Sequence, residues 1–135
     1  MRHLDTNIAS ALINEKRAAE KRAAELQLTR FYPRVAVSAI ALAELWFGVA
    51  NSTQVEANTR KLNEILQDLE IVNFDQKCAN AYGTLRKTLR TMGREIPDAD
   101  MFIAATAMAH NAILVTHNTR HFENIEGLQL EDWLA

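Results

Sequence analysis

The chain has 135 residues, of which 48% are hydrophobic and 24% are charged, and its formal net charge is −2. These values indicate one soluble globular domain over residues 1–135 and exclude a protein that attracts nucleic acid through its overall charge. The one cysteine, Cys78, excludes an internal disulfide and a cysteine-cluster metal site. With no signal peptide and no long apolar span, we expect a cytoplasmic protein without a membrane anchor.

The first predicted elements are a short strand that ends at Leu4 and a helical stretch after it. Apolar residues recur at helical spacing over 8–28, with a break near Asn14, and Phe31-Tyr32-Pro33 ends the pattern. The pattern predicts one or two helices in this segment.

A buried strand and an apolar helix come next. Residues 34–37 form a predicted strand, and Ser38 is placed to cap a helix over 39–50. After Asn51-Ser52, a second cap signal, the apolar residues of 55–69 mark one face of an amphipathic helix.

The second half of the chain begins with another strand followed by a helix. Residues 70–74 are the strand candidate, and Asp75 is placed to cap a helix that Gly93 closes.

The last predicted elements are an apolar helix and the clearest strand. Asp98 stands at the cap position of a helix over 101–110, and residues 112–116 form a continuous apolar run. Residues 128–130 add a final edge strand. Strands that alternate with helices predict a three-layer α/β/α domain with a short parallel sheet of four or five strands.

Three carboxylates stand where an unpaired charge is costly. Asp5 follows the first strand, Glu44 lies inside an apolar helix, and Asp100 opens another apolar helix. A shared divalent cation resolves that cost, and oxygen ligands suit Mg²⁺ or Mn²⁺ rather than zinc.

Polar residues that follow the strands are candidates to support these acids. Asn118 follows the strand over 112–116, whose carboxyl end belongs at the same sheet edge as Asp5. Thr6 and Thr116 can orient the acids by hydrogen bonding, and Asn7 can do so or cap the first helix.

Each candidate also has a purely structural interpretation. Asp5 and Asp98 are favoured helix caps, and Asp100 in a first helical turn is favoured by the helix dipole. Glu44 can face solvent or pair with an arginine, and Asn118 is a common turn residue. Singly, none of these residues decides the function.

Several basic residues are candidates to guide RNA, and each also has an interpretation as part of a solvated surface. The candidates are Arg86 and Arg120 near the acids and Lys16, Arg17, Lys21 and Arg22 along an approach route. The four histidines are not at helical metal-ligand spacing and are interpreted as surface or turn residues: His3, His110, His117 and His121.

Several short motifs follow one another along the chain. They are Leu4-Asp5-Thr6-Asn7; Ser38 with Glu44-Leu45 and Gly48; Gly93-Arg94-x-Ile96; Asp100 with Ile103-Ala104-Ala105 and Ala107; Leu114-Val115-Thr116-x-Asn118 with Phe122; and Leu128-x-x-Glu131-Asp132-Trp133. In this order, and over essentially the whole chain, they resemble the PIN-domain family. The chain length resembles the VapC-type toxins of bacterial and archaeal toxin–antitoxin pairs.

The resemblance implies a metal-dependent endoribonuclease. It implies that Asp5, Glu44 and Asp100 hold Mg²⁺ or Mn²⁺ and that Asn118 takes a fourth catalytic position, where many relatives have aspartate. Asp98 matches none of the acids that the family requires, and we interpret it as a helix cap or as a residue that contacts the ion through water. If two ions bind, they should lie roughly 3.5–4 Å apart, and hydrolysis by activated water should leave 5′-phosphate and 3′-hydroxyl ends.

The resemblance also implies partners. It implies a homodimer silenced by a cognate antitoxin, with transfer RNA as a possible substrate and contact with DNA only through the antitoxin. Four apolar residues are candidate antitoxin contacts, although each can equally belong to the core: Leu12, Ile13, Trp46 and Phe47. The alternative function is an interaction module of the same fold that cleaves little RNA and acts by binding the antitoxin and DNA.

Overall fold

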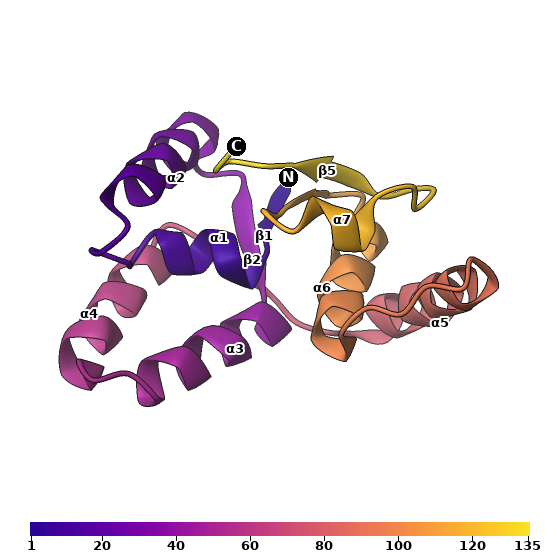
Figure 1. Ribbon diagram of the computed structural model, residues 1–135, viewed down its shortest axis with the longest axis horizontal. Helices are drawn as coiled ribbons and strands as arrows, with labels where there is room; N and C mark the ends of the chain where they lie inside the picture. Colours follow the sequence, from indigo (N-terminus) through magenta and orange to yellow (C-terminus); the bar gives the residue numbers. More distant parts are fainter.

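The computed structural model describes all 135 residues, and a five-stranded parallel sheet lies at its centre (Figure 1). The strand order is β3-β2-β1-β4-β5. The strands are β1 (Arg2–Leu4), β2 (Val35–Ser38), β3 (Glu70–Val72), β4 (Ile113–Val115) and β5 (Gln129–Glu131). The sequence-based prediction of a short parallel sheet is therefore confirmed, with five strands.

Seven helices connect or follow these strands. They are α1 (Thr6–Ala11), α2 (Ala18–Phe31), α3 (Ala39–Ala50), α4 (Val55–Leu66), α5 (Gln76–Thr91), α6 (Asp98–Ala109) and α7 (Thr119–Phe122). The predicted break near Asn14 is real, because α1 and α2 are separate helices. None of the helices is both long enough and apolar enough to span a membrane.

The register of the central strands brings their carboxyl ends together. Leu4 of β1 lies opposite Val37 of β2 on one side and Val115 of β4 on the other. All three residues are completely buried. Whatever follows β1, β2 and β4 along the chain therefore starts from one edge of the sheet.

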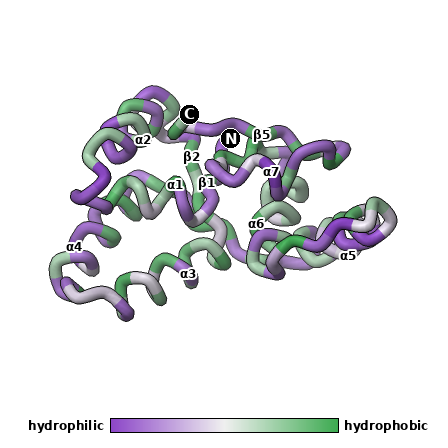
Figure 2. The backbone as a smooth tube through the Cα atoms, in the orientation of Figure 1, coloured by the Kyte–Doolittle hydropathy of each residue, from purple (hydrophilic) through white to green (hydrophobic).

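Helix α6 is hydrophobic along most of its length, as Figure 2 shows, and it is the most buried helix of the fold. Its residues Ile103 to Ala107 are all at most 1% exposed. Helix α5 packs beside it through aromatic rings: Tyr82 stacks on Phe102 at 4.6 Å, and Phe74 meets the same ring edge-on at 5.3 Å. These contacts fix α5 and α6 as neighbours.

Three of the predicted helix caps are confirmed. The Asp5 carboxylate accepts from the Thr6 amide at 2.8 Å, and the Ser38 hydroxyl accepts from the Ala41 amide at 3.0 Å. The Asp75 carboxylate accepts from the Cys78 amide at 3.1 Å. Each satisfies a backbone N–H that has no partner within its helix.

Two other predicted caps are wrong. Pro97 is the N-cap of α6 and Asp98 is already the first helical residue, with an exposed side chain that makes no capping bond. Proline fixes φ at a value that a helix start tolerates, so the helix starts one residue earlier than expected. Gln54, and not Asn51-Ser52, precedes α4, because the Ser52 hydroxyl donates to the Val49 carbonyl and closes α3 instead.

Candidate active site

The candidate site lies where β1, β2 and β4 end. Asp5 directly follows β1, and its amide donates to the Val115 carbonyl of β4 at 2.8 Å. Thr116 follows β4, and α3, which carries Glu44, follows β2. The parallel sheet thus gathers residues that are more than 100 positions apart in the chain.

Asp5 is the buried centre of this edge, with only 3% of its surface exposed. One carboxylate oxygen, Oδ1, accepts from the Thr6 amide, and the other, Oδ2, accepts from the Thr116 hydroxyl at 2.7 Å. These two bonds hold the carboxylate in one orientation. The interpretation of Asp5 as a helix cap is therefore correct, but it accounts for only one of the two oxygens.

The pKa of Asp5 is raised, and the main cause is burial. The hydrogen bonds from Thr116 and Thr6 oppose the shift, whereas the negative charges of Asp100 and Glu44 add to it. Since like charges raise a carboxyl pKa only from nearby, Asp100 and Glu44 belong to the electrostatic surroundings of Asp5. A cation at this edge would reverse the cost of ionising Asp5.

Glu44 reaches the site from the exposed face of α3. Its side chain is open to solvent, and its Oε1 accepts from the Thr6 hydroxyl. Thr6 therefore links two of the acids, because its amide donates to Asp5 and its hydroxyl donates to Glu44. The alternative that Glu44 pairs with an arginine is not realised.

Asp100 lies in the first turn of α6 and is held by a histidine. Its Oδ2 lies 2.8 Å from His121 Nδ1, and its side chain is 15% exposed. His121 is the surface residue that the sequence predicted, with 41% of its side chain exposed, but its bond to a candidate site residue was not predicted. The only signal for it was its place in the segment after β4, at the same edge of the sheet.

An arginine that the sequence analysis did not assign to the site fixes the segment that carries His121. The Arg94 guanidinium donates to the backbone carbonyls of Arg120, His121 and Glu123. Arg94 thus ties the end of α5 to α7, and α7 carries the histidine that bonds Asp100.

The remaining supporting candidates lie near the site in different ways. Asn118 is exposed, and its backbone N–H donates to the Thr116 hydroxyl at 3.1 Å. Asn7 bonds no acid and caps no helix, since its side-chain oxygen accepts from the His117 amide at 3.3 Å. Asp98 is exposed and bonds no other acid.

The three carboxylates offer the oxygen donors that a hard cation prefers, but they do not lie close enough together to contact one ion directly. Oxygen donors suit Mg²⁺ or Mn²⁺, and the hydrogen bonds to the two Asp5 oxygens come from Thr6 and Thr116 and not from a histidine. However, Asp5, Glu44 and Asp100 do not have ligand atoms that all lie within 4.8 Å of one another. The ligand atoms of another group do lie within 4.8 Å of one another; this group is Asp75, Cys78 and His110, in another part of the fold. It includes Cys78, the residue for which the sequence excluded a metal site built from a cluster of cysteines.

The basic candidates are split between ion pairs and open surface. Lys21 pairs with Glu15 at 2.9 Å, and Arg17 lies 3.4 Å from Glu20, so the solvated-face interpretation holds for both. Lys16 lines a groove of about 780 Å³ beside Thr6 and Glu44.

The other basic candidates lie on different surfaces. The Arg86 guanidinium donates to the Tyr82 hydroxyl at 2.9 Å and lines a second groove of about 720 Å³ with Arg94 and Asp98. Arg22 and Arg120 are exposed.

Comparison with known proteins identifies the family. The family model for the PIN domain matches residues 3–128. The chain belongs to the PIN-domain family, as the sequence motifs and the parallel sheet predicted.

Within this family the chain is similar to VapC ribonucleases. It is 42% identical over 130 residues to ribonuclease VapC2 of Rickettsia felis, and the match covers 96% of each chain. It is 32% identical over 130 residues to the tRNA(fMet)-specific endonuclease VapC of Shigella flexneri, again over 96% of each chain.

Solved structures of toxin–antitoxin complexes share the fold. VapBC2 from Rickettsia felis, bound to a DNA fragment from their promoter, superposes with a TM-score of 0.84 at 40% identity, over 98% of each chain. DNA-bound VapBC from Salmonella typhimurium superposes with a TM-score of 0.89 at 30% identity, over 98% of this chain and 97% of that one.

Proposed function

We propose that this chain is a toxin endoribonuclease of the VapC type that depends on Mg²⁺ or Mn²⁺ and is inhibited by a cognate antitoxin. The observation that carries the proposal is the convergence of Asp5, Glu44 and Asp100 at the carboxyl edge of the sheet. The similarity to VapC ribonucleases over almost the whole chain supports it.

Asp5, Glu44 and Asp100 are the residues that would hold the cation, with Asn118 in a fourth position. When bound, a divalent ion activates water and stabilises negative charge on the phosphate. Magnesium usually takes only one or two carboxylates directly and keeps several waters. Asp5, Glu44 and Asp100 would therefore not all need to contact the ion directly.

The surrounding side chains keep the acids oriented. Thr116 holds Asp5 Oδ2 and at the same time accepts from the Asn118 amide, so one hydroxyl sets the position of two candidate site residues. Thr6 couples Asp5 to Glu44, and His121 holds Asp100. This arrangement reduces the reorganisation that cation and substrate binding would require.

Positive charge for the RNA backbone would come from the groove beside Glu44 and from the surface near α7. Lys16 in that groove and the exposed Arg120 are the strongest candidates; Arg22 is exposed on α2, and Arg86 lines the second groove. Lys21 and Arg17 are weaker candidates because both already have acidic partners. Charge-neutralised variants of the phosphate-contacting residues should lower the salt dependence of RNA binding.

RNA cleavage by the purified chain tests the proposal. Incubation with total RNA and Mg²⁺ or Mn²⁺ should release fragments with 5′-phosphate and 3′-hydroxyl ends. Asp5→Asn, Glu44→Gln and Asp100→Asn should each abolish cleavage, whereas Glu56→Gln, a change on the exposed first turn of α4, should not. A 2′,3′-cyclic phosphate product, or equal activity in all variants, would contradict the mechanism.

The partners follow from the same similarity. The similarity to DNA-bound VapBC supports an antitoxin partner that contacts DNA, and the similarity to a tRNA(fMet)-specific endonuclease supports transfer RNA as the substrate class. Coverage of the acidic groove by the antitoxin and a cytoplasmic homodimer are further parts of the proposal that these similarities do not test. Of the four candidate antitoxin contacts, Phe47 is 70% exposed three residues beyond Glu44, whereas Leu12 is only 3% exposed and belongs to the core. Ile13 and Trp46 are half-buried against that core.

One observation favours the second candidate, an interaction module with little nuclease activity. The three carboxylates are not close enough to share one ion directly as they stand. If no divalent metal supports cleavage by the folded wild-type chain, binding of the antitoxin and DNA is the function that remains.

A further inference from the structure

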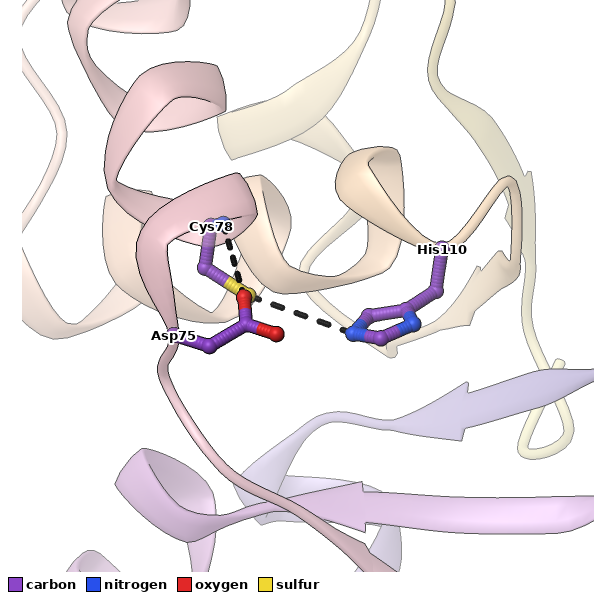
Figure 3. Close-up of side chains that lie close together, drawn as sticks. All are labelled: Asp75, Cys78 and His110. Atoms are coloured by element: carbon purple, nitrogen blue, oxygen red, sulfur yellow. Dashed lines mark hydrogen bonds between the residues drawn. The ribbon is translucent and has the colours of Figure 1, made fainter.

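A second group of metal-ligating side chains lies far from the acidic edge. Asp75, Cys78 and His110 point toward one another (Figure 3), and their ligand atoms all lie within 4.8 Å of each other. They come from the start of α5 and the end of α6. Nothing in the proposed nuclease chemistry uses them.

The group is separated from the acidic site by the length of α6. Asp100 lies in the first turn of this helix and His110 is its C-cap. Ten residues of α-helix rise by roughly 15 Å, so the two groups lie at opposite ends of the same buried helix. An ion bound at one end therefore shares no ligand with an ion at the other.

The donor atoms define which ion the group would accept. Cys78 offers a sulfur, His110 an imidazole nitrogen and Asp75 a carboxylate oxygen. This mixture is typical of Zn²⁺ and unlike the all-oxygen sets that Mg²⁺ prefers. We propose that Asp75, Cys78 and His110 form a binding site for a zinc-like divalent ion, separate from the acidic edge and with its fourth position open to water.

The distances are close to those of a zinc site. Cys78 Sγ lies 4.0 Å from His110 Nε2. A tetrahedral zinc ion holds a sulfur and a nitrogen ligand roughly 3.5 Å apart, so a small rotation of the His110 ring closes the site. His110 is exposed, and the ring of His3 lies beside it with 5.7 Å between the ring centroids.

Asp75 can serve the ion without giving up its place in the helix. Its Oδ1 accepts from the Cys78 amide as a helix cap, and Figure 3 shows this bond beside the sulfur–imidazole contact. The second carboxylate oxygen, Oδ2, is the atom that would contact the ion. Cys78 itself is completely buried, whereas Asp75 and His110 are exposed, so an ion would enter from their side.

Contacts within the fold position the two helices that carry the site. Asp75 and Cys78 stand three residues apart across the first turn of α5, a spacing that puts two side chains on one helix face. The Tyr82–Phe102 and Phe74–Phe102 ring contacts hold α5 against α6, and α6 ends at His110. The backbone positions of the three ligands are thus set by contacts within the fold, and only the His110 ring has to rotate.

Cobalt binding to the whole, tag-free chain tests the proposal directly. A Co²⁺–thiolate bond produces near-ultraviolet charge-transfer absorption, and Cys78 is the only thiol in the chain, so the acidic edge cannot produce this signal. We expect the absorption to saturate at one Co²⁺ per chain, to disappear when Zn²⁺ is added, and to persist with excess Mg²⁺.

Single substitutions separate a built site from simple thiol binding. Cys78→Ser should abolish the absorption, and Asp75→Asn and His110→Gln should each weaken Co²⁺ binding by at least the roughly tenfold that even an outer-shell partner contributes. Asparagine is a good cap, so Asp75→Asn removes the ligand and keeps the helix start. His117→Gln, at an exposed histidine paired with Asp132, should leave binding unchanged.

Two results would overturn the proposal. One is the absence of charge-transfer absorption in the folded wild-type chain; the other is absorption of unchanged affinity in both Asp75→Asn and His110→Gln. RNA cleavage with Mg²⁺ should survive in Cys78→Ser if the chain is a nuclease, so failure of this site and failure of the nuclease proposal give different results.

Discussion

The Asp5 carboxylate accepts two hydrogen bonds, one as the cap of α1 and one from Thr116, and it lies near two other negative charges. Its burial would make the ionised form unfavourable without these bonds. The residues around Asp5 therefore decide how readily it is ionised and, in the proposed mechanism, how well it holds a cation.

The hydroxyl of Thr116 is the most direct test of this dependence. Thr116→Val keeps the shape of a completely buried side chain but removes the donor to Asp5 Oδ2 and the acceptor for the Asn118 amide. The pKa of Asp5 should rise further, because that bond opposes the effect of burial. We expect RNA cleavage at a fixed metal concentration to fall by about tenfold, as a lost hydrogen bond to a charged group implies.

Thr106→Val is the matched control for this change. Thr106 is also completely buried, but its hydroxyl donates only to the Phe102 carbonyl within α6. Titration of the metal requirement in both variants should show a higher requirement for Thr116→Val alone. An equal requirement in the two variants would show that Thr116 has no particular effect on Asp5.

A buried histidine predicts how stability depends on pH. The pKa of His3 is lowered from 6.5 to about 4, mainly by burial and then by the charge of His110. The folded state therefore binds fewer protons than the unfolded state between these values, so the free energy of unfolding should fall as pH drops from 6.5 toward 4. The contribution at stake is about 3 kcal/mol.

Urea denaturation with a chelator present, at several pH values from 7 to 4, measures this dependence. The free energy of unfolding of His3→Gln should depend less on pH than that of the wild type, because glutamine does not titrate. Parallel curves for the two proteins would exclude His3 as the cause. The buried His3 Nδ1 has no hydrogen-bond partner, so the substitution removes no bond at that atom.

At the scale of elements, one arginine joins two helices that the sequence pattern treats separately. Arg94 follows α5, and its guanidinium donates to three carbonyls in and beside α7. Arg94→Ala should leave those carbonyls without this donor and release the segment that orients His121 toward Asp100. A loss of about 2 kcal/mol in unfolding free energy is expected for bonds from a charged donor.

Amide hydrogen exchange locates the effect of Arg94. Exchange should accelerate at residues 119–123 in Arg94→Ala and stay unchanged in Arg90→Ala, whose exposed side chain on α5 makes no such bonds. If residues 119–123 exchange as in the wild type, the three bonds of Arg94 do not hold this segment.

The local signals in the sequence predicted most elements and three of the caps, because an Asp or Ser beside the first turn acts within a few residues. The prediction that Asp98 caps α6 was wrong because Pro97, one residue earlier, takes the cap position. The pairing of His121 with Asp100 and the approach of Cys78 to His110 were missed because they join helices across 21 and 32 residues. No periodicity encodes contacts of that kind.

At the scale of the whole molecule, the order β3-β2-β1-β4-β5 explains why the acidic candidates were predictable. Parallel strands direct their carboxyl ends to one edge, so residues after β1 and β4 meet regardless of their distance in the chain. The same topology places the start of α6 near that edge and its end at the second group of ligands. We therefore expect two ion sites of different chemistry at the two ends of one helix.

The central claim is that Asp5, Glu44 and Asp100 act as one cation site, and binding of Mn²⁺, followed by electron paramagnetic resonance in the Cys78→Ser background, tests it most directly. Asp5→Asn, Glu44→Gln and Asp100→Asn should each weaken Mn²⁺ binding by at least about tenfold, since each removes a ligand or its water-mediated equivalent. Asp68→Asn, at an exposed acid beyond α4, should bind as the parent does. Unchanged Mn²⁺ affinity in Asp5→Asn, or an equal loss in Asp68→Asn, would contradict the account.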